Sequence, residues 1–373
     1  MRPHEIRPRL LLGPGPSPVS ERVLAALARP TVGHLDPQLL ALMDEIQEGL
    51  RRVFGTTNPM TFALSATGSA GMEAALANVL EPGDGAVIGV NGVFGGRLAE
   101  MARRLGARVV EVEAPWGEPI PEERFLDAVR RLPGARVAAL VHAETSTGVE
   151  QPLDGVGRAL ADTDALFLVD AVTSLAGIPV EVDARGIDIC YAGTQKCLGV
   201  PPGLAPITFS PKAMDRIARR TVPCPSWYLD VTLIAGYLGE ERRYHHTAPV
   251  NMLYALREGL ALVEEEGLEA RFARHRAAGE SLQAALVERG FGLFATEGFR
   301  LPQLTAVSLP GGRDEAPLRR ALLERHGIEV GGGLGPAKGR IWRIGLMGEG
   351  ARTSVVDRLL EGVDAVVAVE ALA

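Results

Sequence analysis

The fold is indicated by residues 165–196, which read ALFLVDAVTSLAGIPVEVDARGIDICYAGTQK. This stretch holds two apolar runs, 165–169 and 187–192. Asp170 directly follows the first run, and the turn that contains Gln195 and Lys196 follows the second. Short apolar runs of this kind predict strands that are buried on both faces of a parallel sheet. Because ligands bind at the carboxyl ends of the strands in open parallel sheets, we expect these polar residues to lie at a functional site.

The flanking sequence extends the same pattern in both directions. Residues 37–54 place apolar side chains on one helical face, and a second helix is predicted to begin near Gly68. Alternation of apolar runs with helical periodicity predicts an α/β protein with a mostly parallel sheet flanked by helices. Further strands of that sheet are predicted at 86–90, 108–112 and 137–142.

A chain of 373 residues exceeds the roughly 250–300 residues that one hydrophobic core supports, so two domains are expected. The amphipathic region 250–289 predicts a helix that connects them. Shorter strands (306–309, 341–346) and helices (317–326, 353–367) are predicted after it. We therefore predict an N-terminal segment and a large ligand-binding domain over 1–255. The connecting helix and a small C-terminal α/β domain are predicted over 256–373.

Composition and charge argue against several classes of protein. Lys and Arg total 39 against 46 Asp and Glu, a net charge of −7, and no half is a basic block, which argues against nucleic-acid binding. The apolar runs are far shorter than the ~20 residues that cross a bilayer. Three cysteines without a C-x-x-C pair are typical of a cytoplasmic protein with reduced thiols. The adjacent His245 and His246 lack the further ligands that a metal site needs.

Two features at predicted strand ends could hold a charged ligand. The turn from Thr67 to Gly71 lies at the mouth of a helix, where free N–H groups and the helix dipole suit a phosphate. A plain helix N-cap is the alternative interpretation. Asp170 ends a buried strand, where a carboxylate is costly unless a positive or hydrogen-bonding group meets it. A helix cap or a local ion pair is the alternative there.

Two further residues could act on an amino acid. Lys196 lies in a tight loop, where a crowded lysine can lose its proton and become a nucleophile that forms a Schiff base. Arg343 lies on a predicted strand, on the face opposite Trp342 and Ile344, and could hold a carboxylate bidentately. Taken alone, each residue would more often be a solvated surface cation.

Together the four features supply what pyridoxal phosphate needs: a phosphate cradle, an acid beside the pyridine nitrogen, a lysine for the aldehyde and an anion clamp for an amino acid. The sequence resembles the class V, fold-type I aminotransferases, particularly the alanine–glyoxylate and serine–pyruvate aminotransferases. The motifs that carry the resemblance include LLGPGPS (11–17), STGVEQPLDG (146–155), LFLVDAVTSLAG (166–177), IDICYAGTQKCLGVPPG (187–203), YHHTAPV (244–250) and GGLGPAKGRIWRIGLMG (332–348).

The resemblance implies a homodimeric enzyme whose active site lies at the subunit interface. Its large domain binds pyridoxal phosphate, and it moves an amino group from alanine or serine to glyoxylate or pyruvate by a ping-pong mechanism. Lys196 is implied to bond to the cofactor aldehyde and then to act as the base, and Asp170 to pair with the pyridine nitrogen. Arg343, with backbone near Gly15, is implied to hold the substrate carboxylate.

The resemblance also implies the residues that hold the cofactor. They are Thr67, Gly68, Ser69 and Gln195 at the phosphate, Thr145 near the ring oxygen, Val172 and Phe94 on the two ring faces, and Tyr244 and Thr247 from the neighbouring subunit. Two positions depart from some relatives, which have Trp at the position of Phe94 and His at the position of Ser69. The first departure gives a smaller stacking platform, and the second puts the role of Ser69 in doubt.

Other functions fit less well. An aminotransferase of the same class could use aspartate, phosphoserine or an aminophosphonate as its donor, because one sequence does not reveal the shape of the pocket. The turn Thr67–Gly71 faintly resembles the G-x-S-x-G elbow of an α/β-hydrolase-like serine enzyme, but Thr67 replaces the first glycine and no clear Asp and His follow in order.

Overall fold

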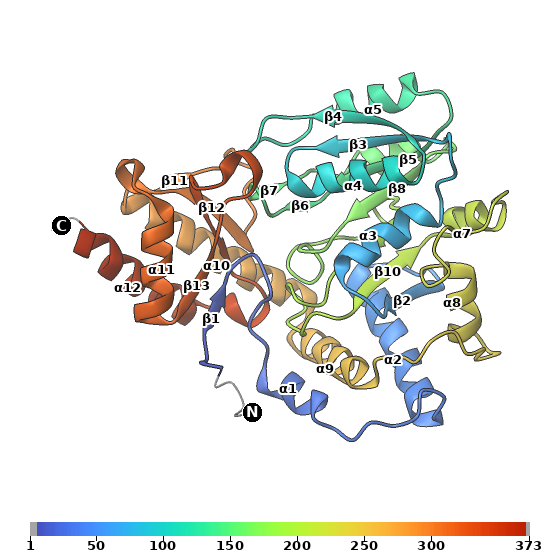
Figure 1. Ribbon diagram of the computed structural model, residues 1–373, viewed down its shortest axis with the longest axis horizontal. Coiled ribbons are helices and arrows are strands. Elements are labelled where there is room, and N and C mark those ends of the chain that lie inside the picture. The colour runs from blue at the N-terminus through green and yellow to red at the C-terminus, as the bar shows by residue number, and fades with distance from the viewer. Residues whose placement is uncertain (1–5, 371–373) are drawn as a thin grey trace.

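The computed structural model describes residues 6–370 and divides its main strands between two sheets (Figure 1). The larger sheet has the order β2-β10-β9-β8-β5-β3-β4. Its strands β3, β4, β5, β8 and β9 are parallel, whereas β10 runs antiparallel to both β9 and β2. The α/β fold with a mostly parallel sheet is therefore confirmed, with one antiparallel strand, β10, that was not predicted. The bounds are β2 Met60–Leu64, β3 Gly85–Val90, β4 Arg108–Glu113, β5 Ala135–Val141, β8 Leu166–Asp170, β9 Ile189–Tyr191 and β10 Ala205–Phe209.

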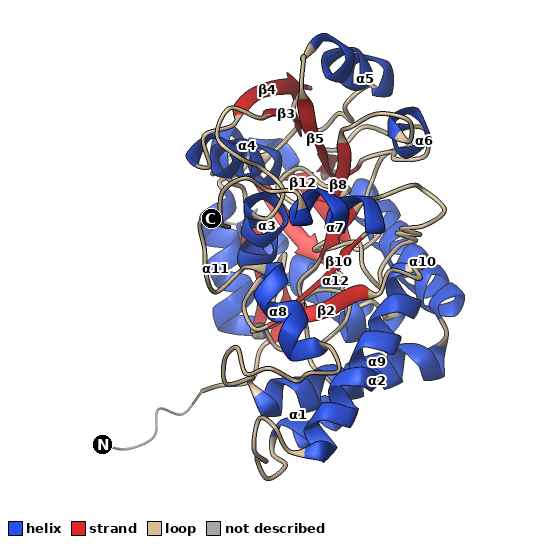
Figure 2. Cartoon of the chain, turned by 90° about the vertical axis from the view of Figure 1, so that its right-hand side faces the viewer, coloured by secondary structure: helices blue, strands red, loops and turns tan. Residues whose placement is uncertain are grey.

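Helices cover both faces of this sheet (Figure 2). Successive side chains of a strand point to opposite faces, so Leu166 and Leu168 pack in one core and Phe167 and Val169 in the other. The helices of the first core are α3 (Gly68–Ala77), α4 (Val93–Arg104), α7 (Pro211–Ala218) and α8 (Val231–Leu238). Those of the second are α2 (Pro37–Phe54), α5 (Glu122–Arg131), α6 (Val156–Leu160) and α9 (Val250–Glu266). None of the helices described is both long and apolar enough to cross a bilayer, and the cytoplasmic location stays a prediction.

The smaller sheet has the order β1-β13-β14-β12-β11 and packs against α10, α11 and α12. Its first strand comes from the opposite end of the chain, because Leu10–Leu12 pairs in parallel with Ile328–Val330. Trp342 and Ile344 are buried in this core, as the alternation of the predicted strand requires. The bounds are β1 Leu10–Leu12, β11 Gly292–Leu293, β12 Leu304–Ser308, β13 Ile328–Gly332, β14 Ile341–Gly345, α10 Leu268–Glu288, α11 Glu315–His326 and α12 Thr353–Glu370. The remaining elements are α1 (Glu21–Leu27), the hairpin β6 (Ala143–Glu144) and β7 (Val149–Glu150), and the short 3-10 turns η1 (Pro310–Gly312), η2 (Gly335–Ala337) and η3 (Gly348–Gly350).

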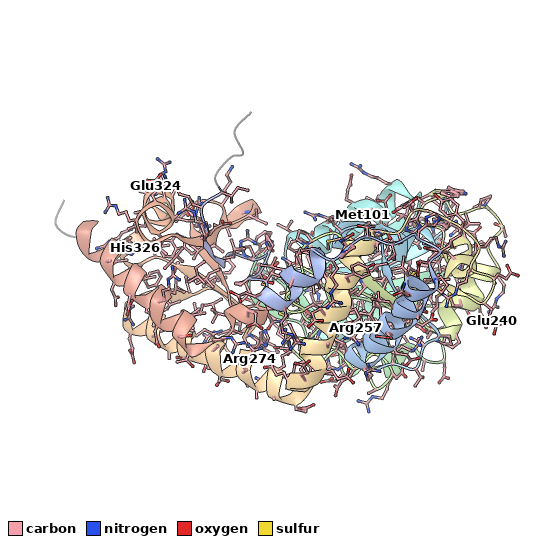
Figure 3. All side chains as sticks on the ribbon, turned by 90° about the horizontal axis from the view of Figure 1, so that it is seen from below. Met101, Glu240, Arg257, Arg274, Glu324 and His326 are labelled. Carbon is pink, nitrogen blue, oxygen red and sulfur yellow. The ribbon has the colours of Figure 1, made fainter. Side chains whose placement is uncertain are left out.

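The prediction of a single continuous helix over 250–289 is wrong. The structure has two helices, α9 and α10, which are separated at Gly267 by a backbone φ of 80° that glycine adopts readily. Arg274 of α10, labelled in Figure 3, donates to Glu266 and to the carbonyls of Gly348 and Ala351, and so fixes the bend. The domain boundary predicted at 255/256 falls inside α9, and the division into domains stays a prediction.

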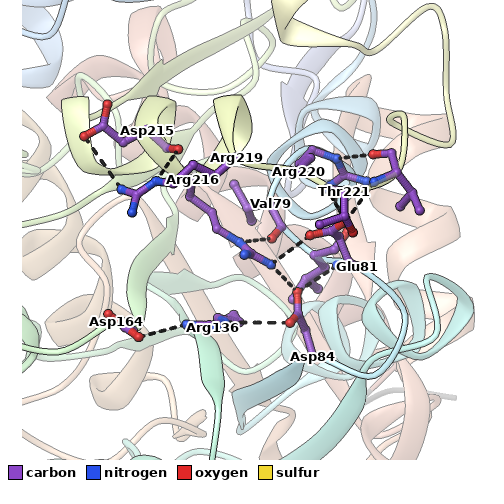
Figure 4. A network of polar contacts seen from close by, with 12 residues as sticks. Val79, Glu81, Asp84, Arg136, Asp164, Asp215, Arg216, Arg219, Arg220 and Thr221 are labelled. Carbon is purple, nitrogen blue, oxygen red and sulfur yellow. Dashed lines mark hydrogen bonds and ion pairs between the residues drawn. The ribbon is translucent and has the colours of Figure 1, made fainter.

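Ion pairs join the amino-terminal ends of the larger sheet's strands (Figure 4). Arg216 of α7 donates to Asp84, directly before β3, at 2.6 Å. Arg136, at the start of β5, is 3.7 Å from Asp84 and 3.0 Å from Asp164, which precedes β8. These contacts hold the end of the sheet that faces away from the strands' carboxyl ends, where the predicted site residues lie.

Close packing of α4 on β3 gives a test of this arrangement with two adjacent glycines. A Cβ at Gly95 would overlap the carbonyl oxygen of Gly89 and lie 3.0 Å from the Cα of Val90, whereas a Cβ at Gly96 would meet no atom within 4 Å. We expect Gly95→Ala to lower the free energy of unfolding by about 1–3 kcal/mol, because α4 must move off the sheet. Gly96→Ala should raise it by up to about 1 kcal/mol, because alanine favours the helix. Thermal unfolding followed by circular dichroism measures both, and equal midpoints for the two variants would contradict the packing.

Candidate active site

A cavity of about 150 Å³ lies at the carboxyl ends of the central strands. Val141 of β5, Asp170 of β8 and Tyr191 of β9 are neighbours in the sheet register there. Eight of the residues predicted for the site line the cavity together: Gly68, Ser69, Phe94, Thr145, Asp170, Val172, Gln195 and Lys196. Five further lining residues were not predicted: Met72, Arg97, Val141, Ala143 and Thr173.

Asp170 is a buried carboxylate that two donors hold in place. Its Oδ2 accepts a hydrogen bond of 2.7 Å from the Tyr191 hydroxyl, and its Oδ1 accepts one of 2.9 Å from the Val172 backbone N–H. Burial raises the pKa of Asp170, and these hydrogen bonds together with the charge of Lys196 oppose that rise. Asp170 forms no ion pair with any described residue. The carboxylate is therefore fixed in orientation and available to a group in the cavity.

Lys196 stands in the turn after β9, under the N-terminal segment. Its Nζ donates to the carbonyl of Pro14, and the Ser17 hydroxyl donates to the Lys196 carbonyl at 2.7 Å. A Cβ at Gly15 would lie only 2.6 Å from Nζ, so a glycine is needed for this close passage. Burial lowers the pKa of Lys196 to about 8, with a smaller contribution from the charge of Arg343. A fraction of this amine is thus neutral near physiological pH, as a nucleophile or base requires.

The amino-terminal end of α3 offers uncapped N–H groups to the cavity. Thr67 is the N-cap residue, yet its side chain makes no cap hydrogen bond. A Cβ at Gly68 would lie 3.2 Å from Val172 Cγ2 and 3.8 Å from Gly193 Cα, so the helix end approaches the other cavity walls closely. The Gln195 Oε1 is buried without a hydrogen-bond partner among the described residues. The N–H groups of the helix end can receive an anion. The Gln195 Oε1 accepts hydrogen bonds and cannot do so, which leaves the NH2 group of this side chain as its only donor.

Glu144 organises the wall that carries Phe94, and it was not predicted. Its Oε2 accepts from the backbone N–H of Phe94 at 3.0 Å and of Gly95 at 3.3 Å, and its Oε1 accepts from the Ser146 hydroxyl at 2.6 Å. Ser146 in turn accepts from the Val93 N–H at 3.0 Å. Glu144 therefore caps α4 from another segment, and burial raises its pKa. The polar turn after residues 137–142 was the only signal in the sequence.

Arg343 of β14 brings the smaller sheet to the cavity's edge. Its Nε donates to the Gly332 carbonyl at 2.7 Å and its Nη1 to the Thr145 carbonyl at 3.3 Å. No carboxylate among the described residues forms an ion pair with it. Burial lowers the pKa of Arg343. A buried guanidinium without a counterion next to a cavity is suited to binding a carboxylate.

Tyr244 and Thr247 do not join the other predicted residues within this chain. Both lie outside the cavity lining. The Tyr244 side chain is 57% exposed, and its hydroxyl lies 3.3 Å from the Thr247 hydroxyl. The expectation that a neighbouring subunit brings them to the site stays a prediction.

Comparisons with known proteins agree on one family. The family model described as "Aminotransferase class-V" matches residues 17–356. An alanine–glyoxylate aminotransferase of Callithrix jacchus is 44% identical over 97% of this chain and 88% of the relative. A crystal structure of alanine–glyoxylate aminotransferase from Nostoc sp. superposes with a TM-score of 0.96 at 48% identity and covers 98% of this chain and 97% of that chain. A ureidoglycine–glyoxylate aminotransferase structure from Bacillus subtilis gives 0.96 at 42% identity, with coverages of 98% and 95%.

The lowered pKa of Lys196 can be tested by chemical reactivity. A limiting amount of acetic anhydride, added to protein cleared of bound carbonyl compounds, acylates neutral amines only. We expect acetylation of Lys196 to rise with pH around a midpoint near 8, because half of the amine is neutral at its pKa. Peptide mass spectrometry locates the label readily, because the chain has only three lysines, Lys196, Lys212 and Lys338. A midpoint at the ordinary lysine pKa of about 10.4 would contradict the buried environment.

Proposed function

Because the chain belongs to the class-V aminotransferase family, we propose that it is a pyridoxal-phosphate enzyme that transfers an amino group from a small amino acid to glyoxylate. The observation that carries the proposal is the placement of Lys196 and Asp170 on one cavity with the uncapped end of α3. Relatives named for alanine–glyoxylate and for ureidoglycine–glyoxylate transfer share glyoxylate, which supports that acceptor. Pyruvate as acceptor and serine as donor remain within the same proposal.

The residues present fit this cofactor. The α3 end, with Thr67, Gly68 and Ser69, would hold the phosphate through its N–H and hydroxyl groups. Gln195 would contribute through its side-chain NH2 group, because its Oε1 only accepts hydrogen bonds. Val172 and Phe94, both on the cavity wall, would cover the two ring faces, and Thr145 would lie near the ring oxygen. Asp170 would pair with the pyridine nitrogen, and Lys196 would bond to the aldehyde.

When bound, pyridoxal phosphate supplies an electron sink for the bonds at the substrate Cα. The Asp170 carboxylate, fixed by Tyr191 and Val172, stabilises a proton on the ring nitrogen. Lys196 Nζ, with its pKa lowered to about 8, would take the Cα proton in its neutral form and would return it to the cofactor carbon that carries the aldehyde. Arg343, with backbone near Gly15, holds the substrate carboxylate. One cavity admits the donor and the acceptor in turn, so ping-pong kinetics are expected.

The cations at the cavity bear on which amino donor the protein uses. Alanine and (S)-ureidoglycine appear in the names of similar proteins, and an aspartate aminotransferase structure from Thermus thermophilus is 30% identical with a TM-score of 0.86. Among the described residues, the cavity lining holds two cations, Lys196, which would bond to the aldehyde, and Arg97, which contacts Ser69 at the proposed phosphate end. Within this part of the chain, this leaves no cation besides Arg343 for a second acidic group. A small neutral donor therefore fits best.

Turnover of a donor panel tests the function. Purified protein with pyridoxal phosphate and glyoxylate should form glycine from alanine or serine faster than from aspartate or phosphoserine, as measured by chromatography of the amino acids. Lys196→Ala should reduce turnover by at least about 10²-fold, the usual contribution of a positioned base. The exposed Lys338→Ala is the matched control and should leave turnover unchanged. Glycine formation by Lys196→Ala at the parent rate would overturn the assignment.

Substitution of Arg343 separates substrate binding from chemistry. Arg343→Lys keeps a charge but loses the planar pair of donors, so we expect KM for the amino donor to rise by roughly ten-fold or more, the loss of about 1.4 kcal/mol. The cofactor's absorbance should persist, because Arg343 lies outside the cavity lining. Arg340→Lys, at an exposed position nearby, serves as the control. An unchanged KM would exclude Arg343 as the clamp.

We further propose a homodimer that completes the site. The exposed Tyr244 and Thr247 would then contact the phosphate bound by the partner, and the exposed Trp227, with 62% of its surface accessible, would be covered. Sedimentation equilibrium should give twice the mass of the chain. A monomer that retains full turnover would rule out this contribution.

A further inference from the structure

Arg97 is a cation on the cavity wall that is not among the residues expected to bind the cofactor or the substrate. It lies on α4, one turn after Phe94, and lines the same cavity as Lys196 and Asp170. The Arg97 guanidinium carbon stands 5.0 Å from the centroid of the Phe94 ring, and Nη1 donates to the Ser69 hydroxyl at 3.3 Å. The two contacts orient the guanidinium between the ring platform and the amino-terminal end of α3.

Arg97 has no acidic partner. The ion pairs found among residues 6–370 include many arginines of the surface helices, yet none involves Arg97. Its charge instead acts on the cavity, where it opposes the rise in the pKa of Asp170 that burial causes. An arginine that stacks on an aromatic ring and donates to a hydroxyl, with no carboxylate nearby, has donors left for an anion.

The end of the cavity next to Ser69 needs a positive charge if a phosphate binds there. A phosphate monoester carries a charge of about −1.5 to −2 near neutral pH, whereas a helix terminus supplies only about half a positive charge. The other groups at this end, Gly68, Ser69 and Gln195, are neutral. Lys196 is the only other cation of the lining, and its amine contacts the Pro14 carbonyl.

We propose that Arg97 binds the phosphate group of the cofactor. The inference rests on the proposed function, because pyridoxal phosphate is the ligand. Phe94 then has two tasks, since its ring covers the cofactor ring and also orients the guanidinium that neutralises the phosphate. Ser69 serves as a second donor beside Arg97, which gives it a role despite its departure from the histidine of some relatives.

Pyridoxal, which lacks the phosphate, separates this role from a purely structural one. Full-length protein freed of cofactor is titrated with pyridoxal phosphate and with pyridoxal, and the visible absorbance of the lysine-bound aldehyde gives each Kd. Arg97→Gln should weaken pyridoxal phosphate binding by roughly 10- to 100-fold, the range of one charge-assisted hydrogen bond. Its Kd for pyridoxal should equal that of the parent. Arg97→Lys, which keeps the charge, should recover part of the loss.

Two controls accompany these titrations. Arg124→Gln removes an equally exposed arginine on α5, outside the cavity, and should change neither Kd. Added salt should weaken pyridoxal phosphate binding more in the parent than in Arg97→Gln, because ions screen the interaction with the guanidinium.

Two outcomes would overturn the role of Arg97 alone. One is parental affinity of Arg97→Gln for pyridoxal phosphate. The other is an equal loss of affinity for both aldehydes, which would mean that Arg97 acts only by orienting Phe94. A parent protein that binds neither aldehyde would instead overturn the proposed cofactor, and the inference with it.

Discussion

The site depends on a carboxylate that is buried where three parallel strands end. Such a burial costs several kcal/mol unless donors meet the charge, and the Tyr191 hydroxyl and the Val172 N–H do so for Asp170. The sheet itself fixes the position of Tyr191, which is the register partner of Asp170 on the adjacent strand. Val172 lies in the turn directly after β8. The orientation of this acid is therefore a consequence of strand pairing, and any slip between β8 and β9 would break it.

The opposite wall depends on a second buried carboxylate with a different task. Glu144 meets only donors, namely backbone N–H groups of α4 and the Ser146 hydroxyl and N–H. Gly92 leaves room for it, since a Cβ there would overlap the Glu144 side chain. Phe94 and Arg97 are thus positioned by α4, and Glu144 and Ser146 from another segment of the chain hold the start of that helix. The two carboxylates therefore have different roles, because Asp170 lines the cavity and Glu144 caps α4.

The sequence predicts those elements whose structure depends on residues close together in the chain. The central strands and α2 were predicted because continuous apolar runs or a clear helical face define them. Asp170 was predicted because it directly follows such a run, and Lys196 because it lies in the turn after one. The strands β1, β10 and β13 were missed, because β1 has only three residues, Pro206 interrupts the apolar run of β10, and β13 ends in two glycines. Their places depend on distant partners, such as Ile328 for Leu10. Glu144 and Arg97 were missed for the same reason, because their contacts with Phe94 and Ser69 join residues that the sequence does not place together. The break at Gly267 was hidden by apolar periodicity on both sides.

In the proposed function, cofactor and substrate would be held by different sheets. The groups expected to hold the cofactor lie on the larger sheet and its helices, whereas Arg343 belongs to the smaller sheet and reaches the site through one hydrogen bond to the Thr145 carbonyl. The N-terminal segment joins both, because Leu10–Leu12 is a strand of the smaller sheet while Pro14 accepts from Lys196. A substrate carboxylate on Arg343 would therefore bring the smaller sheet and this segment against the lysine, so that binding of the amino acid and the position of the base are mechanically linked.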